Sequence, residues 1–205
     1  MTPNLRRFEN KAREKGFAAI AGIDEAGRGP LAGPVVAAAV IFPPDLTIDG
    51  IDDSKKLTPK KRDTLLEIIY REAISVGIGI VDPEEIERTN ILKAALLAMA
   101  MAVGNLCPPA DCLLIDGIFP IASPLPQETI PKGDSRSISI AAASIVAKET
   151  RDHLMRRYHE EYPEFGFDRH MGYPTKAHKA AIAAHGVCPI HRRTFRGVRE
   201  FLAGV

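Results

Sequence analysis

AGIDEAGRGPLAGP, residues 21–34, joins two apolar, β-rich runs of the chain. These runs cover 17–24 and 34–42 and predict two strands of an antiparallel hairpin. The first run delivers two adjacent carboxylates, Asp24 and Glu25, directly into a glycine-rich turn. Carboxylates next to a turn without bulky side chains suit a hard divalent cation and a phosphate that comes close to the backbone. The stretch therefore indicates a nuclease-like site.

Strands and helices follow one another along the rest of the chain. Thr58 before Pro59 predicts a helix N-cap, and Ser137 predicts another. Thr175 and Gly186 are expected to begin and end a later helix. The pattern predicts further strands at 76–81, 112–115 and 128–130, a loop at 166–174, and helices at 59–74, 83–88, 91–104, 138–162, 175–185 and 196–202. This order indicates one α/β or α+β sheet with helices packed on it.

Charge is unevenly distributed along the chain. The formal net charge is only +1, but residues 63–131 hold three basic residues against ten acidic ones. Basic residues gather instead in 55–62 and 187–199. Separated basic clusters suit a polyanion that contacts the surface in several places, whereas solvated helix faces would give the same pattern. The accompanying carboxylates favour the polyanion.

Length and composition indicate a globular protein of one domain, or of one domain with a small appendage. No apolar stretch is long enough to cross a membrane, and no apolar segment follows the basic N-terminal residues as in a secretory signal. The three cysteines, Cys107, Cys112 and Cys188, are odd in number and lack zinc-type spacing. We therefore expect reduced thiols in a cytoplasmic protein.

Four acidic residues share one local pattern, because each ends an apolar strand or opens a helix near a glycine. They are Asp24, Glu25, Asp116 and Asp134. Any one of them alone is more often a solvated strand-end carboxylate, but together they predict a site for Mg²⁺, which would neutralise their repulsion. Neighbours on a regular strand face opposite sides. Either the chain begins to rotate at Gly27, or Glu25 reaches the site through its longer side chain.

The glycines of the turn have a separate meaning. Gly27 and Gly29 flank Arg28, so they allow positive φ and a close approach of backbone N–H groups to a ligand. A tight hairpin turn would use the same glycines. The stretch is not a dinucleotide-binding fingerprint, because the segment after it is predicted to be a strand rather than a helix.

Five motifs occur in an order that resembles the bacterial ribonuclease HII family, within the type 2 ribonucleases H. The resemblance covers residues 18–196, and no position within the motifs departs from the family pattern. The motifs are GIDEAGRGP (22–30), DSKKL (53–57), IDG (115–117), KGDS (132–135) with SIAAASIVAK (139–148), and GYPTKAH (172–178). The resemblance implies an α/β fold with a ribonuclease H-like mixed sheet flanked by helices. It also implies a catalytic core at 1–163 and a helical C-terminal extension at 164–205, packed on the core.

The resemblance further implies a metal-dependent endonuclease for RNA in RNA–DNA hybrids and for ribonucleotides embedded in duplex DNA. The family's catalytic and metal-binding acids correspond to Asp24, Glu25, Asp116 and Asp134. Two Mg²⁺ or Mn²⁺ ions would activate a water that attacks the phosphorus in line, and departure of the 3′-oxygen would leave 5′-phosphate and 3′-hydroxyl ends.

Substrate recognition is implied for a second set of positions, which would recognise the ribose 2′-OH at an RNA-to-DNA junction. These are Gly27, Arg28, Gly29 and Tyr173. The 2′-OH is the one group that separates the two sugars, and it can both donate and accept hydrogen bonds. Lys55 is a candidate phosphate contact, and Lys148 is a weaker one, since a lysine on a helix surface is usually only solvated.

The C-terminal basic residues Arg192, Arg193 and Arg196 are expected to bind the duplex backbone without reading its sequence. The six histidines share no metal-like spacing with a carboxylate and are interpreted as structural or surface groups.

Two other functions compete with a ribonuclease H. A DNA-directed enzyme of the same superfamily would share the acids but would not need residues that recognise the ribose 2′-OH. A non-catalytic nucleic-acid-binding module would need no clustered acids, and the low aromatic content, 6% with no Trp, offers few residues for base stacking. No long apolar patch indicates an obligate dimer, so we expect a monomer without membrane contact.

Overall fold

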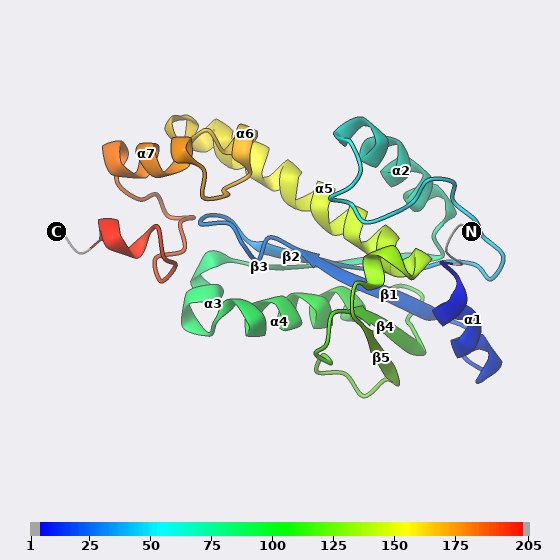
Figure 1. The fold of residues 1–205 in the computed structure, drawn as a ribbon. Helices are drawn as coiled ribbons and strands as arrows, with labels where there is room; N and C mark the ends of the chain where they lie inside the picture. The colour runs from blue at the N-terminus through cyan, green and yellow to red at the C-terminus, as the bar shows by residue number, and fades with distance from the viewer. Residues whose placement is uncertain (1–4, 203–205) are drawn as a thin grey trace.

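The computed structural model describes residues 5–202 and contains a five-stranded sheet with helices on both faces (Figure 1). The strands are β1 (Ile20–Ala26), β2 (Val35–Ile41), β3 (Ser75–Val81), β4 (Cys112–Asp116) and β5 (Gln127–Ile130). The α-helices are α1 (Arg7–Glu14), α2 (Pro59–Glu72), α3 (Pro83–Arg88), α4 (Ile91–Gly104), α5 (Ile138–Glu161), α6 (Phe167–His170) and α7 (Lys176–His185). Short 3₁₀ turns are η1 (Gly133–Ser135), η2 (Pro163–Phe165) and η3 (Arg199–Phe201). Within residues 5–202, none of the helices combines the length and the apolar character that crossing a membrane requires.

The sheet has the strand order β3-β2-β1-β4-β5. β1 pairs antiparallel with β2, with Ala21 opposite Ile41 and Ala26 opposite Val36, which confirms the predicted hairpin. β3 pairs antiparallel with β2, whereas β4 is parallel to both β1 and β5. The predicted mixed sheet is therefore confirmed. Because β1 and β4 are parallel neighbours, their carboxyl ends meet at one edge of the sheet.

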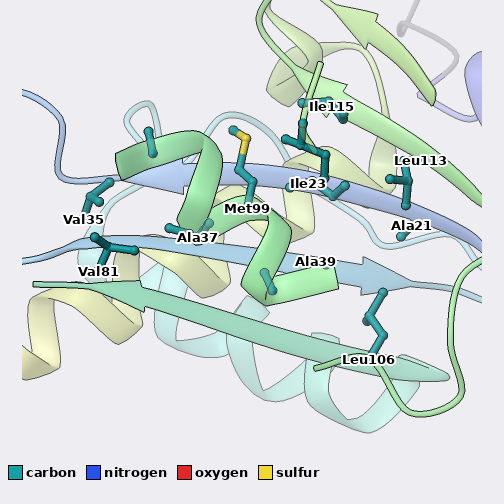
Figure 2. Close-up of a cluster of buried hydrophobic side chains, with 14 of the residues drawn as sticks. Ala21, Ile23, Val35, Ala37, Ala39, Val81, Met99, Leu106, Leu113 and Ile115 are labelled. Carbon is teal, nitrogen blue, oxygen red and sulfur yellow. The ribbon is translucent and has the colours of Figure 1, made fainter. Parts of the chain in front are cut away.

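Two helical layers cover the sheet, because successive side chains of each strand point to opposite faces. α4 covers one face, and Figure 2 shows its Met99 directed toward the strands near Ile23 and Ala37. α5 and α2 cover the other face, where Leu65 of α2 and Val40 of β2 belong to one buried cluster. The sheet is thus enclosed on both sides, and its strand ends are left to carry polar groups.

The N-terminal helix α1 was not among the predicted elements. Its apolar side, with Phe8 and Ala12, packs on side chains of β1, β4 and β5 and on Ile140 of α5. Its Glu9 is buried and accepts hydrogen bonds from Ser137 Oγ at 2.6 Å and from the backbone N–H of Ser139 at 3.1 Å. The Glu9 carboxylate therefore stabilises the N-terminus of α5, where a negative charge is favoured by the helix dipole.

The C-terminal part is less regular than predicted. The segment expected to be a loop at 166–174 contains the single-turn helix α6, and the helix expected at 196–202 is reduced to the turn η3. Both differences follow from packing, because Phe167 and Val198 are fully buried in one cluster that also contains Met155 of α5. Tertiary contacts have overridden local propensity here. The division into a core and an extension at residue 163 stays a prediction.

Candidate active site

Asp24 and Glu25 lie at the carboxyl end of β1 and face opposite sides of the sheet. The strand remains regular through the pair Ala26–Val36, so the chain does not rotate before the turn. Asp24 is only 3% exposed and is hydrogen-bonded to Ser144 on α5. Glu25 lines a cavity on the opposite side, against α4. The chain leaves the ladder at Gly27, which has a positive φ, and Asp116 lines the same cavity as Glu25, so how Glu25 reaches the other acids stays a prediction.

Asp116 and Asp134 lie at the same edge of the sheet. Ile23 of β1 is paired with Ile115 of β4, which places Asp116 beside Asp24. Asp116 Oδ1 accepts a hydrogen bond from the backbone N–H of Gly133 at 2.6 Å. This bond holds the turn η1, and with it the buried Asp134, against the end of β4.

Two carboxyl groups at this edge, Asp24 and Asp134, have a raised pKa. Burial raises the pKa of Asp24 well above its ordinary value, and the carboxylates of Glu25 and Asp116 raise it further. Burial also raises the pKa of Asp134, together with Asp53 and Asp116. Such a site favours a bound cation, because positive charge would relieve both the repulsion and part of the cost of burial.

Two side-chain cations lie among these acids. Arg28 Nη1 is 3.1 Å from Glu25 Oε1, and Lys55 Nζ is 3.9 Å from Asp134 Oδ2. Burial lowers the pKa of Lys55, but surrounding carboxylates outweigh it and raise the pKa overall; these belong to Asp24, Asp53, Asp134 and Asp116. As the side chains stand, residues 5–202 contain no group of three or more His, Cys, Asp or Glu that could hold a metal ion.

The glycine-rich loop, residues 27–34, lies next to the acids and against Tyr173. Gly27 has φ +99°, whereas Gly29 has no positive φ, so only one of the two glycines uses the freedom predicted for both. A Cβ atom on Gly29 would lie 3.6 Å from Tyr173 Cε1. The half-exposed Tyr173 ring therefore lies beside Gly29 at the surface of the site.

Residues 21–198 match the family model described as Ribonuclease HII. The chain belongs to the ribonuclease HII family. A curated ribonuclease HII from Geobacter sulfurreducens is 58% identical over 98% of this chain and 92% of its own length. The ribonuclease H2 structure from Pyrococcus horikoshii is 27% identical with a TM-score of 0.73, covering 89% of this chain and 96% of that one. A ribonuclease HII from Archaeoglobus fulgidus, solved in a complex with PCNA, is 26% identical with a TM-score of 0.71, covering 87% and 95%.

Family membership confirms the predicted endonuclease of the ribonuclease H type. The same membership does not favour either competing function, a DNA-directed nuclease or a non-catalytic binding module. The roles of individual residues in this chain rest on the site geometry.

Arg192, which was predicted to bind the duplex backbone, lies in the interior of the protein and not on its surface. Arg192 is fully buried, and its guanidinium donates to backbone carbonyls of the glycine-rich loop, so a direct phosphate contact by Arg192 was a wrong prediction. Arg193 and Arg196 are exposed. Lys148 pairs with Asp152 on the next turn of α5. An arginine looks like a surface residue in sequence, and only the fold reveals its burial.

Three polar residues at the site were not singled out from the sequence. Ser144 contacts Asp24, Ser54 Oγ is 2.8 Å from Ser144 Oγ, and Arg151 donates to the glycine-rich loop. Ser144 follows the helix N-cap Ser137 by seven residues, so helical periodicity could have placed both on one face.

Tyr173 is anchored by a chain of hydrogen bonds through buried histidines. The backbone carbonyl of Tyr173 accepts from His178 Nδ1 at 3.0 Å, and His178 Nε2 lies 3.1 Å from His191 Nε2. His191 Nδ1 accepts from the backbone N–H of Cys188 at 2.9 Å. This network assigns one proton to each imidazole, so both rings are neutral. The prediction that these histidines are structural agrees with their burial.

Mild acid is expected to destabilise the fold through this histidine pair. Burial lowers the pKa of His178 and of His191 to about 4. Both rings stay neutral in the folded state, whereas the unfolded chain takes up protons below pH about 6.5. Stability is therefore lost as the pH falls from 6.5 toward 4, by roughly 2 kcal/mol for each histidine between pH 7 and pH 5.

Urea unfolding at pH 7 and pH 5 measures this loss. His178→Gln should reduce the pH dependence, while His153→Gln, at an exposed position on α5, should leave it unchanged. The same change in unfolding free energy between pH 7 and pH 5 in the wild type and in His178→Gln would contradict the assignment of neutral buried rings.

Proposed function

We propose that the chain cleaves the RNA strand of RNA–DNA hybrids and cuts at ribonucleotides embedded in duplex DNA, leaving 5′-phosphate and 3′-hydroxyl ends. The observation that carries this proposal is the position of the buried Asp24 carboxylate. It lies among other acids at the edge of the sheet, directly before a loop whose exposed backbone lies beside Tyr173. An endonuclease that hydrolyses a phosphodiester bond next to a ribose needs its catalytic acids close to the residues that bind the sugar.

We propose that Mg²⁺ or Mn²⁺, as two ions in the substrate complex, is held by Asp24, Glu25, Asp116 and Asp134. The donor set fits, because hard cations take carboxylate oxygens and the raised pKa of Asp24 reflects first its burial and then the repulsion from Glu25 and Asp116, which a cation would relieve. Since these acids do not form a ready-made group, phosphate oxygens of the substrate would complete the ligands. When bound, such ions lower the pKa of a water and stabilise charge on the phosphate.

The chain's own residues have separate roles in this reaction. Ser144 fixes the Asp24 carboxylate, and the Gly133 N–H fixes Asp116. Lys55, which is largely exposed beside Asp134, can meet a phosphate of the incoming strand. Its raised pKa keeps the ammonium protonated at neutral pH.

We propose that Gly27, Arg28 and Gly29, with Tyr173, recognise the ribose 2′-OH at the RNA-to-DNA junction. The carbonyls of Gly27 and Arg28 both accept hydrogen bonds from the buried Arg192. In a trans peptide the N–H points opposite to the C=O, so the N–H groups of Arg28 and Gly29 point away from the interior. Both residues are exposed, and these two N–H groups can bind an oxygen of the substrate.

Tyr173→Ala should reduce the preference for the RNA-to-DNA junction by about tenfold, because the aromatic surface next to Gly29 is lost. Its melting temperature should change little, since Tyr173 is 43% exposed. The ratio of kcat/KM at the junction to kcat/KM inside a long RNA stretch measures the effect. Tyr70→Ala, at another exposed tyrosine on α2, is the matched control. Equal cutting throughout the RNA by wild type and Tyr173→Ala would contradict this role.

A duplex with one ribonucleotide, compared with an all-DNA duplex, tests the substrate class. Cutting of the ribonucleotide-containing duplex alone supports the proposal, and comparable cutting of all-DNA duplex would favour a DNA-directed nuclease.

We further propose that the chain is a monomer that acts in the cytoplasm, with its catalytic core at 1–163 and a C-terminal extension at 164–205. Support for the extension comes from a buried cluster that it shares with the core, in which Phe165 and Ile182 join Leu31 and Met155. Three free thiols are consistent with a reducing compartment.

A further inference from the structure

Two buried arginines are bound to the glycine-rich loop. Arg151 on α5 is 1% exposed and Arg192 is fully buried. Within residues 5–202, neither forms a salt bridge with a carboxylate. Burying cations without a paired acid is costly, and burial lowers the pKa of Arg151 to about 10 and that of Arg192 to about 9. Both nevertheless remain protonated at neutral pH.

Arg192 uses its guanidinium entirely on the loop. Its three nitrogens make five hydrogen bonds of 2.6–3.2 Å, which matches the five N–H donors of the group. All five acceptors are backbone carbonyls of the loop; they belong to Gly27, Arg28, Pro30, Gly33 and Pro34. The loop is therefore wrapped around one planar cation, with its carbonyl groups turned inward.

Arg151 connects this loop to the segment that carries Tyr173. Its Nε and Nη2 donate to the carbonyls of Pro34 and Ala32, and its Nη1 donates to the carbonyl of Met171, each at 3.0 Å. The Pro34 carbonyl is shared with Arg192. Arg151 thus spans the two proposed halves of the ribose-recognition site, whose separation it can set.

The fit between Arg151 and the loop is close. A Cβ atom on Gly27 would lie 2.2 Å from Arg151 Nε, so the missing side chain at Gly27 makes room for the guanidinium. Leu31 N donates to the carbonyl of Gly172 at 2.8 Å, a second link between the same two segments. The spacing between Gly29 and Tyr173 is therefore determined by buried groups beneath the loop, namely the Arg151 guanidinium and the backbone bond between Leu31 and Gly172.

We propose that Arg151 and Arg192 are positioning residues that determine recognition of a single ribose within DNA, by fixing the loop against Tyr173 and turning its N–H groups outward. The inference rests on the proposed function. A lone ribonucleotide offers a single 2′-OH at one position along the duplex. If the loop and Tyr173 are displaced, no other 2′-OH is available for them to bind. A continuous RNA–DNA hybrid offers a 2′-OH at every nucleotide of the RNA strand, so the same displacement should lower its cleavage less.

Arg151→Lys and Arg192→Lys test this inference because they retain the positive charge but lose the planar array of donors. For each variant, kcat/KM is measured on a duplex with one ribonucleotide and on a continuous RNA–DNA hybrid. We expect the ratio of the first to the second to fall at least about tenfold, since small displacements of positioned groups cost one to two orders of magnitude. Arg156→Lys, at an exposed position on the same helix as Arg151, should leave the ratio unchanged.

The outcomes separate the inference from the proposed function. Folded variants with the wild-type ratio overturn the inference while the function stands, and a wild type that cuts neither substrate overturns the function. Thermal melting reports the fold of each variant. Arg151→Lys is the milder change, because the five Arg192 bonds and the Leu31–Gly172 bond remain. If even Arg151→Lys fails to fold, the arginine pair is structural and the positioning role is rejected.

Discussion

Asp24→Asn should lower the rate of cleavage at neutral pH by at least about a thousandfold, on the scale of losing a group that stabilises transition-state charge. The protein should be as stable as the wild type, or more stable. Asp24 is buried among acids, and its raised pKa means that the folded state resists its ionisation. The amide has nearly the same shape but carries no charge, so it removes this penalty together with the proposed metal ligand.

The pH dependence has a definite sign. The contribution of Asp24 to stability is lost as the pH rises from about 3.8 through its raised pKa, because the unfolded chain ionises first, and this loss opposes the gain from the buried histidines. Asp24→Asn should lack this loss. Single-turnover cleavage and urea unfolding in metal-free buffer measure the two effects, with the exposed Asp63→Asn on α2 as the control. Unimpaired turnover of Asp24→Asn would remove Asp24 from the site.

Gly22→Ala should lower the free energy of unfolding by more than about 3 kcal/mol or prevent folding. A Cβ atom at this position would lie 2.2 Å from the carbonyl carbon of Ser139 and 2.3 Å from the backbone N of Ile140. Both atoms belong to the backbone of α5, so no side-chain rotation can relieve the clash. β1 and α5 would have to separate, and they carry Asp24 and Ser144.

Gly104→Ala is the matched control for this prediction. Gly104 ends α4, and a Cβ atom there would meet nothing within 4 Å. The substitution should raise stability by up to about 1 kcal/mol through helix propensity. Thermal melting of both variants decides the matter, and a Gly22→Ala protein with the wild-type melting temperature would contradict the close contact of β1 with α5.

Local signals predicted much of the secondary structure. Thr58, Ser137 and Thr175 each accept a hydrogen bond from a backbone N–H in the first turn of the helix that they were predicted to cap. Helix α1 was missed because its partner, the N-terminus of α5, lies far away in sequence. The parallel pairing of β1 with β4 also depends on distant segments, and no local pattern encodes it.

The candidate site was only partly visible in the sequence. The repeated placement of acids at strand ends located Asp24 and Asp116, which the structure places side by side on paired strands. Arg192 was misplaced because a run of arginines resembles a solvated surface. Its actual role depends on the loop folding around it, and burial of a charged group is a property of the tertiary structure.

Digestion of a duplex that carries a single ribonucleotide, with and without Mg²⁺ and with the product ends identified, is the most direct measurement. We expect one cut at the 5′ side of a phosphate next to the ribose, with 5′-phosphate and 3′-hydroxyl ends, and no cut without the ion. Two results would contradict the account: cleavage without a metal ion, or cyclic phosphate ends formed by attack of the 2′-OH. Either would show that the acids at the ends of β1 and β4 do not bind the metal ions that hydrolyse the phosphodiester bond.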